Sequence, residues 1–278
     1  MFLGYNTNGF AHHRLDDALA IIASLGYRGV ALTLDVHHLD PLAPELPDRL
    51  TAVRKQLAYH QLRCVIETGA RFLLDPRRKH QPTLLSPSST ERQTRFCFLK
   101  QCIDIAADLQ AEAVSFWSGT PTDEAPAAEL MQRLVDGCSR LAEYAATRNV
   151  RLAFEPEPGM FIDTLDRFAE LFDRVHHPYF GLTLDIGHLV CQGELPVSRF
   201  LTQWQPVLWN IHIEDMLRGI HDHRMFGEGE VDFADVFTGL RAARYRGGVY
   251  VELSRHSHDA VATARRSFEF LQRYLAIS

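Results

Sequence analysis

Two patterns of apolar residues alternate along the chain. Short runs rich in β-branched and aromatic residues are typical of buried strands, and longer segments with an apolar residue at every third or fourth position are typical of amphipathic helices. Strands are predicted at residues 2–5, 29–34, 62–66, 113–117, 150–154, 179–184, 208–213 and 248–251. Helices are predicted at residues 15–25, 44–60, 91–109, 124–146, 168–175, 196–207, 233–245 and 261–275.

The regular alternation predicts an α/β protein with a parallel sheet, because a strand, a helix and a second parallel strand form a right-handed crossover unit. Eight such units in 278 residues fit a closed (β/α)8 TIM barrel better than an open sheet. No GxGxxG turn follows the first strand, where a dinucleotide-binding sheet would carry one. No linker divides the chain, so we expect a single TIM barrel domain spanning residues 1–278.

The composition limits the kinds of partner that the protein is expected to bind. Hydrophobic residues make up 46% of the chain, which is enough for a sizeable core, and the formal charge of −6 does not favour binding to nucleic acid or to an acidic membrane. Five scattered cysteines without a CxxC motif are typical of reduced thiols. Neither a signal peptide nor an apolar run of ~18 residues is evident, so we expect a cytoplasmic protein. The sequence is also compatible with a homo-oligomer.

Four of the predicted strands carry a polar residue at or directly next to their C-terminal end, namely Glu155, Asp185, His212 and Glu252. Buried parallel strands are almost wholly apolar, and in a barrel the residues at their C-terminal ends converge on one mouth. Three carboxylates and one imidazole are a hard ligand set that suits Mn²⁺, Mg²⁺ or Co²⁺. An internal hydrogen-bond network is the alternative, but without a metal the carboxylates would repel one another.

The residues around these positions resemble a known family, the xylose isomerase-like barrels. This family includes sugar isomerases, ketose 3-epimerases and the apurinic endonuclease IV enzymes. The matching segments are Phe-Glu155-Pro, Leu-Asp185-Ile-Gly-His188, Ile-His212-Ile-Glu-Asp215, Gly227-Glu-Gly-Glu-Val-Asp-Phe233 and Val-Glu252-Leu. The resemblance covers the C-terminal half well, and the N-terminal half only through the repeat of strands and helices.

The resemblance implies that Glu155, Asp185, His212 and Glu252 bind one divalent metal, with Mn²⁺ expected and Mg²⁺, Co²⁺ or Zn²⁺ as alternatives. It also places His188 and Arg218 beside the substrate. Alternatively, His188 could orient the metal ligand Asp185 without contacting the substrate.

Three further residues are expected to bind substrate. Glu67 follows the third strand and could pair with Arg71 across the cavity mouth. Trp117 could form an apolar wall against a sugar ring, although barrel packing would also explain it. His223 could hold a second metal together with His188, or be an ordinary loop histidine. The basic run 77–80 could capture a phosphate or carboxylate, or be a solvated surface.

We therefore predict a metal-dependent isomerase or epimerase of a sugar or a sugar-like polyol or ketose. Glu155 and Glu252 would be the catalytic pair, transferring protons through a metal-stabilised enediolate. The alternatives are a hydrolase or phosphodiesterase of the endonuclease IV type, a dehydratase of a cyclic hydroxy-ketone, and a non-catalytic carrier. The net charge counts against the nuclease, as does the lack of histidines where the third and fourth strands end.

Overall fold

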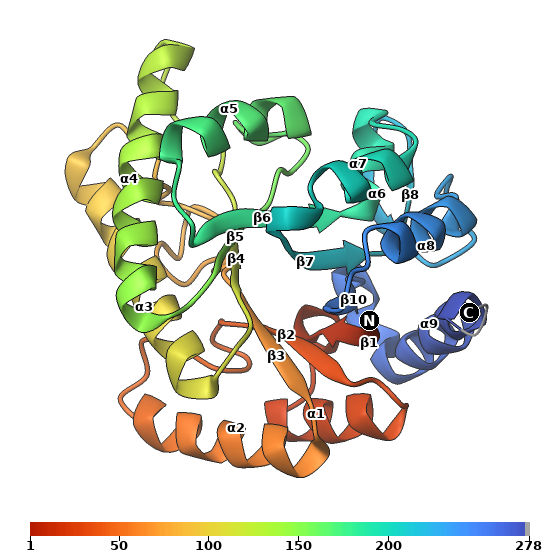
Figure 1. The fold of residues 1–278 in the computed structure, drawn as a ribbon. Coiled ribbons are helices and arrows are strands. Elements are labelled where there is room, and N and C mark those ends of the chain that lie inside the picture. Colours follow the sequence, from red (N-terminus) through yellow and green to blue (C-terminus); the bar gives the residue numbers. More distant parts are fainter. Residues whose placement is uncertain (276–278) are drawn as a thin grey trace.

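Eight parallel strands close into a barrel in the computed structural model, which describes residues 1–275 (Figure 1). The predicted domain extends to residue 278, and residues 276–278 lie outside the described part. The strands are hydrogen-bonded in the order β1-β10-β7-β6-β5-β4-β3-β2, which confirms the predicted (β/α)8 barrel. Their bounds are β1 Phe2–Asn6, β2 Gly29–Thr33, β3 Arg63–Glu67, β4 Val114–Phe116, β5 Leu152–Phe154, β6 Phe180–Asp185, β7 Leu208–Ile213 and β10 Gly248–Val251.

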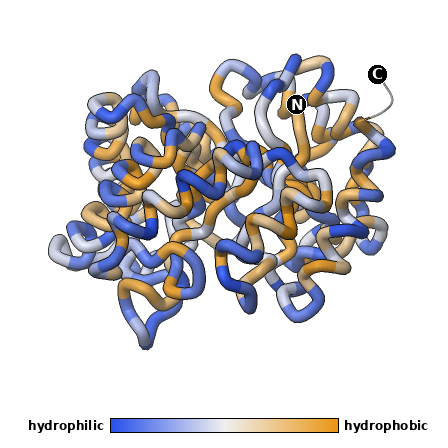
Figure 2. The backbone as a smooth tube through the Cα atoms, turned by 90° about the horizontal axis from the view of Figure 1, so that it is seen from below, coloured by the Kyte–Doolittle hydropathy of each residue, from blue (hydrophilic) through white to orange (hydrophobic). Residues whose placement is uncertain are grey.

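An outer layer of helices surrounds the barrel (Figure 1). Hydrophobic and hydrophilic residues are interspersed along the helices (Figure 2), and each helix has buried apolar residues. The N-termini of α3 and α5 are capped by the hydroxyl groups of Ser88 and Thr164, which accept backbone N–H groups. The helices of this layer are α1 Leu15–Ser24, α2 Leu46–His60, α3 Ser89–Leu109, α4 Ala127–Arg148, α5 Leu165–Val175, α7 Val197–Gln203, α8 Phe233–Ala242 and α9 Ala260–Leu275. None of the described helices is both long and apolar enough to cross a membrane.

The inside of the barrel is filled in layers. One cluster consists of small side chains packed around the buried ring of Tyr250. Gly4 leaves room for this ring, because a Cβ there would lie 2.3 Å from the Cδ1 atom of Tyr250. A polar layer follows, in which the Thr183 hydroxyl donates to Ser115 Oγ at 2.9 Å.

The next inward-facing positions along the strands carry the charged side chains. Inward positions recur every second residue in a strand, so Ala153 is followed by Glu155, Thr183 by Asp185, Asn210 by His212 and Tyr250 by Glu252. The same alternation links Val65 to Glu67 on β3. The strand register therefore brings residues that are far apart in sequence to one level of the barrel.

Two segments that the sequence pattern left as loops are ordered. A short helix, α6 Ile186–Gln192, follows β6, and an antiparallel hairpin of β8 Asp215–Leu217 and β9 Ile220–Arg224 follows β7. The predicted helix 196–207 is divided into α7 and a 3-10 turn, η2 Gln205–Val207, at Pro206, which has no N–H group to continue the helix. Two more 3-10 turns, η1 Thr7–Phe10 and η3 Ser254–Asp259, follow β1 and β10.

Candidate metal centre and active site

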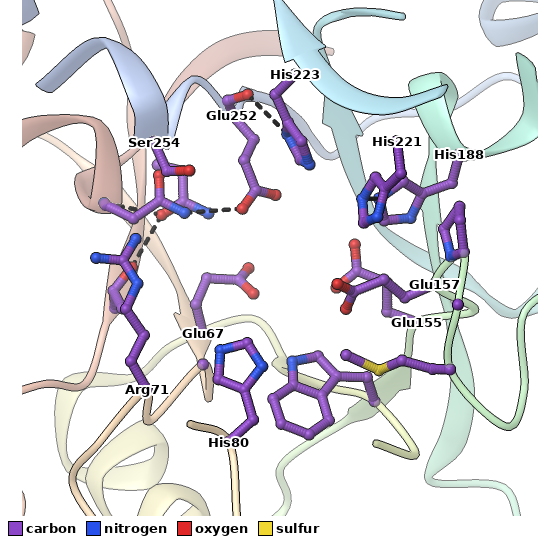
Figure 3. A pocket seen from close by; sticks show the side chains of 18 of the residues that line it. Glu67, Arg71, His80, Glu155, Glu157, His188, His221, His223, Glu252 and Ser254 are labelled. Atoms are coloured by element: carbon purple, nitrogen blue, oxygen red, sulfur yellow. Dashed lines mark hydrogen bonds between the residues drawn. The ribbon is translucent and has the colours of Figure 1, made fainter. Parts of the chain in front are cut away.

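A cavity of about 400 Å³ opens at the C-terminal mouth of the barrel (Figure 3). Most of the residues that the sequence singled out line it, namely Glu67, Trp117, Glu155, His188, His223 and Glu252. Asp185 and His212 lie deeper, with exposed fractions of 2% and 1%. The cavity also contains polar residues from the loop after β3 and from η1 and η3.

The four predicted ligand residues converge on one point. One potential ligand atom from each of Glu155, Asp185, His212 and Glu252 lies within 4.8 Å of the others. The Nδ1 atom of His212 lies 2.9 Å from Glu155 Oε1, 3.0 Å from Glu252 Oε2 and 3.9 Å from Asp185 Oδ2. Neighbouring strands β5, β6, β7 and β10 supply the four side chains, so the barrel wall itself sets their spacing.

Glu67 occupies the other side of the His212 ring. Its Oε1 atom lies 2.9 Å from His212 Nε2 and also accepts a hydrogen bond from the Asn210 amide at 3.2 Å. When Nε2 donates its proton to Glu67, Nδ1 points to the other three carboxylates, as in the carboxylate–histidine pairs that orient metal ligands. Glu67 was expected to contact substrate, and the structure places it both on the cavity wall and against His212.

The buried carboxylates strongly affect one another and His212. Burial disfavours the charged imidazole, but Glu67, Glu155 and Glu252 outweigh this effect and raise the pKa of His212 well above its usual value. Burial raises the pKa of Glu155 to about 8 despite the nearby imidazole. Burial acts in the same direction on Glu252, but His212 outweighs it and lowers the pKa of that carboxyl below its usual range.

This donor set fits a divalent cation. The Oδ2 atom of Asp185 is buried without a hydrogen-bond partner in the described part of the chain, although it lies near His212. The carboxylates around His212 raise its pKa, so this part of the site favours a positive charge. Three carboxylates and one imidazole are ligands suited to Mn²⁺, Mg²⁺, Co²⁺ or Zn²⁺.

Glu214 is a further buried acid that the sequence analysis did not single out. It is fully buried, and burial together with Asp185 raises its pKa well above the usual value. Neither of its carboxyl oxygens has a hydrogen-bond partner among the described residues, and a protonated Glu214 would not repel the neighbouring Asp185 carboxylate. Its position two residues after His212 was the available signal, because both residues face the same side of a strand.

Three histidines form a second group beside the first. Ligand atoms of His188, His221 and His223 lie within 4.8 Å of one another, and the Nε2 atoms of His188 and His221 are 3.1 Å apart. The Nδ1 atom of His188 lies 3.1 Å from the carbonyl oxygen of Pro156. Burial lowers the pKa of His188 to about 4 and also lowers the pKa of His221, which favours neutral imidazoles. The hairpin β8–β9 brings His221 and His223 over the cavity.

Arg218 lies away from this cavity. It is in the turn of the β8–β9 hairpin, its side chain is exposed, and it is not among the lining residues. The hairpin explains the difference from the expectation, because the chain moves outward at Arg218 and returns at His221. Asn8, which the sequence analysis missed, does contact the site, since its amide donates to Glu252 Oε1 at 2.7 Å.

Fold and site together define a class of protein: a (β/α)8 barrel with a group of carboxylates and histidines suited to a metal at its C-terminal mouth. The profile of the xylose isomerase-like TIM barrel family matches residues 19–274. The chain belongs to this family.

Several known proteins are similar to nearly the whole of this chain. The L-ribulose-5-phosphate 3-epimerase UlaE of Escherichia coli is 22% identical over 266 residues, which cover 94% of this chain and 89% of that protein. The D-allulose 3-epimerase from Methylomonas sp. in complex with D-allulose superposes with a TM-score of 0.78 at 20% identity, covering 99% and 97% of the two chains. The IolI protein with a bound zinc atom superposes with a TM-score of 0.75 at 17% identity, covering 99% of both.

Proposed function

We propose that this protein is a divalent-metal-dependent epimerase that inverts a carbon next to the carbonyl group of a ketose. The observation that carries the proposal is the arrangement of Glu155 and Glu252, which come from different strands and lie within 3.0 Å of the same His212 nitrogen. Relatives that match over nearly the full length are 3-epimerases of a ketose phosphate and of a free ketose, and a zinc-bound relative shares the fold.

Glu155, Asp185, His212 and Glu252 would hold the metal, which would polarise the substrate carbonyl when bound. Glu155 and Glu252 face the open centre of the cavity from different walls (Figure 3). One carboxylate accepts the proton from carbon while the electron pair moves into the carbonyl, which forms an enediolate. The other returns a proton to the opposite face, so the configuration at that carbon is inverted.

The surrounding residues hold this pair in place. Asn8 donates to Glu252 and restricts its carboxylate, while Glu67 restricts the His212 ring. Trp117 and the three histidines line the same cavity. These residues orient the reacting groups and support general acid–base catalysis. General acid–base catalysis typically raises the reaction rate by about 10²–10⁴-fold.

The endonuclease alternative has less support. Glu67 and Trp117 occupy the ends of β3 and β4, where histidines would be needed for a cluster of several metals. A hydrolase acting on nucleic acid would also need a basic groove, and the chain has a formal charge of −6.

The test combines metal binding with a ketose panel. Titration of purified metal-free protein should show one tightly bound Mn²⁺, and His212→Ala should lose most of it while the helical circular dichroism signal is retained. Glu155→Gln and Glu252→Gln should each lower ketose epimerisation, measured by NMR, by about 10²-fold or more. Glu143→Gln, on the exposed face of α4, is the matched control and should act like wild type. Absence of metal binding, or full activity in either active-site variant, would reject the proposal.

A further inference from the structure

We infer that the cavity binds a substrate with a terminal phosphate group, held by Arg71 and Lys79. This inference rests on the proposed function, since it concerns the part of the same substrate that lies away from the catalytic carboxylates. Both residues belong to the loop between β3 and α3, and both line the cavity.

The loop folds so that its basic residues lie together. The backbone N–H of His80 donates to the carbonyl oxygen of Arg71 at 2.6 Å, which closes a ten-residue segment on itself. Arg71 and His80 are thereby placed on the side of the cavity away from His188 and His221 (Figure 3). Lys79 is next to His80 in the chain and lines the same cavity.

Arg71 and Lys79 lack the carboxylate partners that neighbouring cations have. Arg78 in the same loop pairs with Asp75 at 2.7 Å and with Glu91 at 2.8 Å. Arg255, the other arginine of the cavity, pairs with Asp222 at 2.5 Å. For Arg71 and Lys79, no carboxylate of the described chain lies within 4.0 Å.

Arg95 adds a third positive charge behind the cavity wall. Its side chain is 1% exposed, its guanidinium lies 4.5 Å from the centre of the Trp117 ring, and its Nη2 atom donates to the carbonyl oxygen of Thr68. Its Nη1 atom is buried without a partner in residues 1–275. Burial lowers the pKa of Arg95 to about 10, so it is charged at neutral pH.

His80 lies close to all three of these positive charges, and its pKa reflects them. Its ring centre lies 5.1 Å from that of Trp117, on the cavity wall. Burial is the main reason that the pKa of His80 falls to about 4, and the charges of Lys79, Arg95 and Arg71 lower it further. A neutral imidazole keeps one N–H donor for a bound oxygen.

The cavity therefore has two ends of opposite character. The carboxylates of the candidate metal site lie at the deep end. At the other end, Arg71 and Lys79 provide positive charge that no carboxylate neutralises. A ketose with its carbonyl at the deep end would direct its far end to these cations. A phosphomonoester fits best, because its two negative charges and three acceptor oxygens can bind an arginine fork and a lysine together.

The test compares phosphorylated and free forms of one ketose. Wild-type protein and the variants Arg71→Met and Lys79→Met are assayed with L-ribulose 5-phosphate and with L-ribulose, and with the xylulose pair. In each variant the ratio of kcat/KM for the phosphorylated form to that for the free form should fall by about 10–100-fold, mainly through KM, as expected for a lost charge-assisted hydrogen bond. Arg77→Met is the matched control, because Arg77 is exposed in the same basic run and lies outside the cavity.

A binding measurement makes the outcome independent of turnover. Calorimetry with inorganic phosphate should show binding to the wild type and to Arg77→Met, and at least tenfold weaker binding to the Arg71→Met/Lys79→Met double variant. Equal phosphate binding in all proteins, or a preference for free ketoses in the wild type, overturns the phosphate site even if epimerisation is observed. Loss of phosphate binding in the double variant without epimerisation of any ketose keeps the phosphate site and rejects the proposed function.

Discussion

Gly187 shows how tightly side chains are packed around the candidate metal site. It lies in α6 between Asp185 and His188, and a Cβ there would come within 2.0 Å of Glu214 Oε1 and 2.9 Å of Met216 Cε. Glu214 is fully buried and cannot turn into solvent. The glycine in the Asp-Ile-Gly-His segment is therefore explained by the space that the buried Glu214 side chain needs beside Asp185.

Gly187→Ala should weaken the site as well as the fold. We expect a loss of about 1–3 kcal/mol in the free energy of unfolding, the usual range for an overpacked core position, together with weaker Mn²⁺ binding. Urea denaturation and metal titration measure the two effects. Gly69→Ala is the control for stability, because a Cβ there would meet nothing within 4 Å. Wild-type metal affinity in Gly187→Ala would show that Glu214 does not support Asp185.

At the level of residues, the sequence was sufficient where a strand position fixes where a side chain points. Glu155, Asp185, His212 and Glu252 come together because each is the inward-facing residue where its strand ends. Contacts across the barrel, such as Glu67 with His212, depend on strand tilt and side-chain rotamers, which the pattern does not contain. Other side chains, such as Arg218, depend on the path of a loop.

At the level of elements, long periodic segments were predicted within a few residues, while short polar ones were missed. The seven-residue helix α6 is too short to show a helical period, and its formation depends on Asp185, whose carboxylate accepts the His188 backbone N–H at 2.8 Å. Strand β9 contains mainly polar residues and has no alternating apolar face. Both elements are formed by contacts with the barrel mouth rather than by their own sequence pattern.

The junction of α5 with the loop after α6 predicts a pH effect on stability. Glu194 accepts the backbone N–H of Leu165, the first residue of α5, at 2.9 Å. Burial raises its pKa to about 7, and Asp166 and Asp163 add to the rise, against the effect of this hydrogen bond. A raised carboxyl pKa means that the folded protein binds the proton more tightly than the unfolded chain, so this contribution to stability is complete below about pH 4.5 and is lost as the pH rises to about 7.

Glu194→Gln should remove this dependence. Relative to wild type, the variant should gain about 1–2 kcal/mol in the free energy of unfolding between pH 5 and pH 8, a value reduced for the partial exposure of the side chain. Denaturation curves at both pH values give the difference, with Glu143→Gln as the exposed control. A constant difference between Glu194→Gln and wild type across this range would show that Glu194 has an ordinary pKa in the folded protein.

Across the whole molecule, the packed layers and the candidate catalytic residues lie at different levels along the barrel axis. A layer around Tyr250 fills one part of the barrel, a polar layer lies next to it, and the carboxylates and histidines face the open mouth. This order follows from the period of two along the strands and from the common direction of all eight. It places Glu155 and Glu252 around a space that a small substrate can enter, which is the basis of the proposed proton transfer.

Deuterium exchange tests the proposed proton transfer at carbon. The metal-loaded protein is incubated in D₂O with the ketose or ketose phosphate that it epimerises, and the carbon-bound positions are followed by NMR. Proton transfer through Glu155 and Glu252 predicts that deuterium enters at the inverted carbon next to the carbonyl. Glu155→Gln and Glu252→Gln should each lower epimerisation by about 10²-fold or more, because inversion needs a proton-transferring group on each face of the carbon. Epimerisation of the ketose without solvent deuterium at carbon would contradict proton transfer by Glu155 and Glu252 and leave the two glutamates as metal ligands alone.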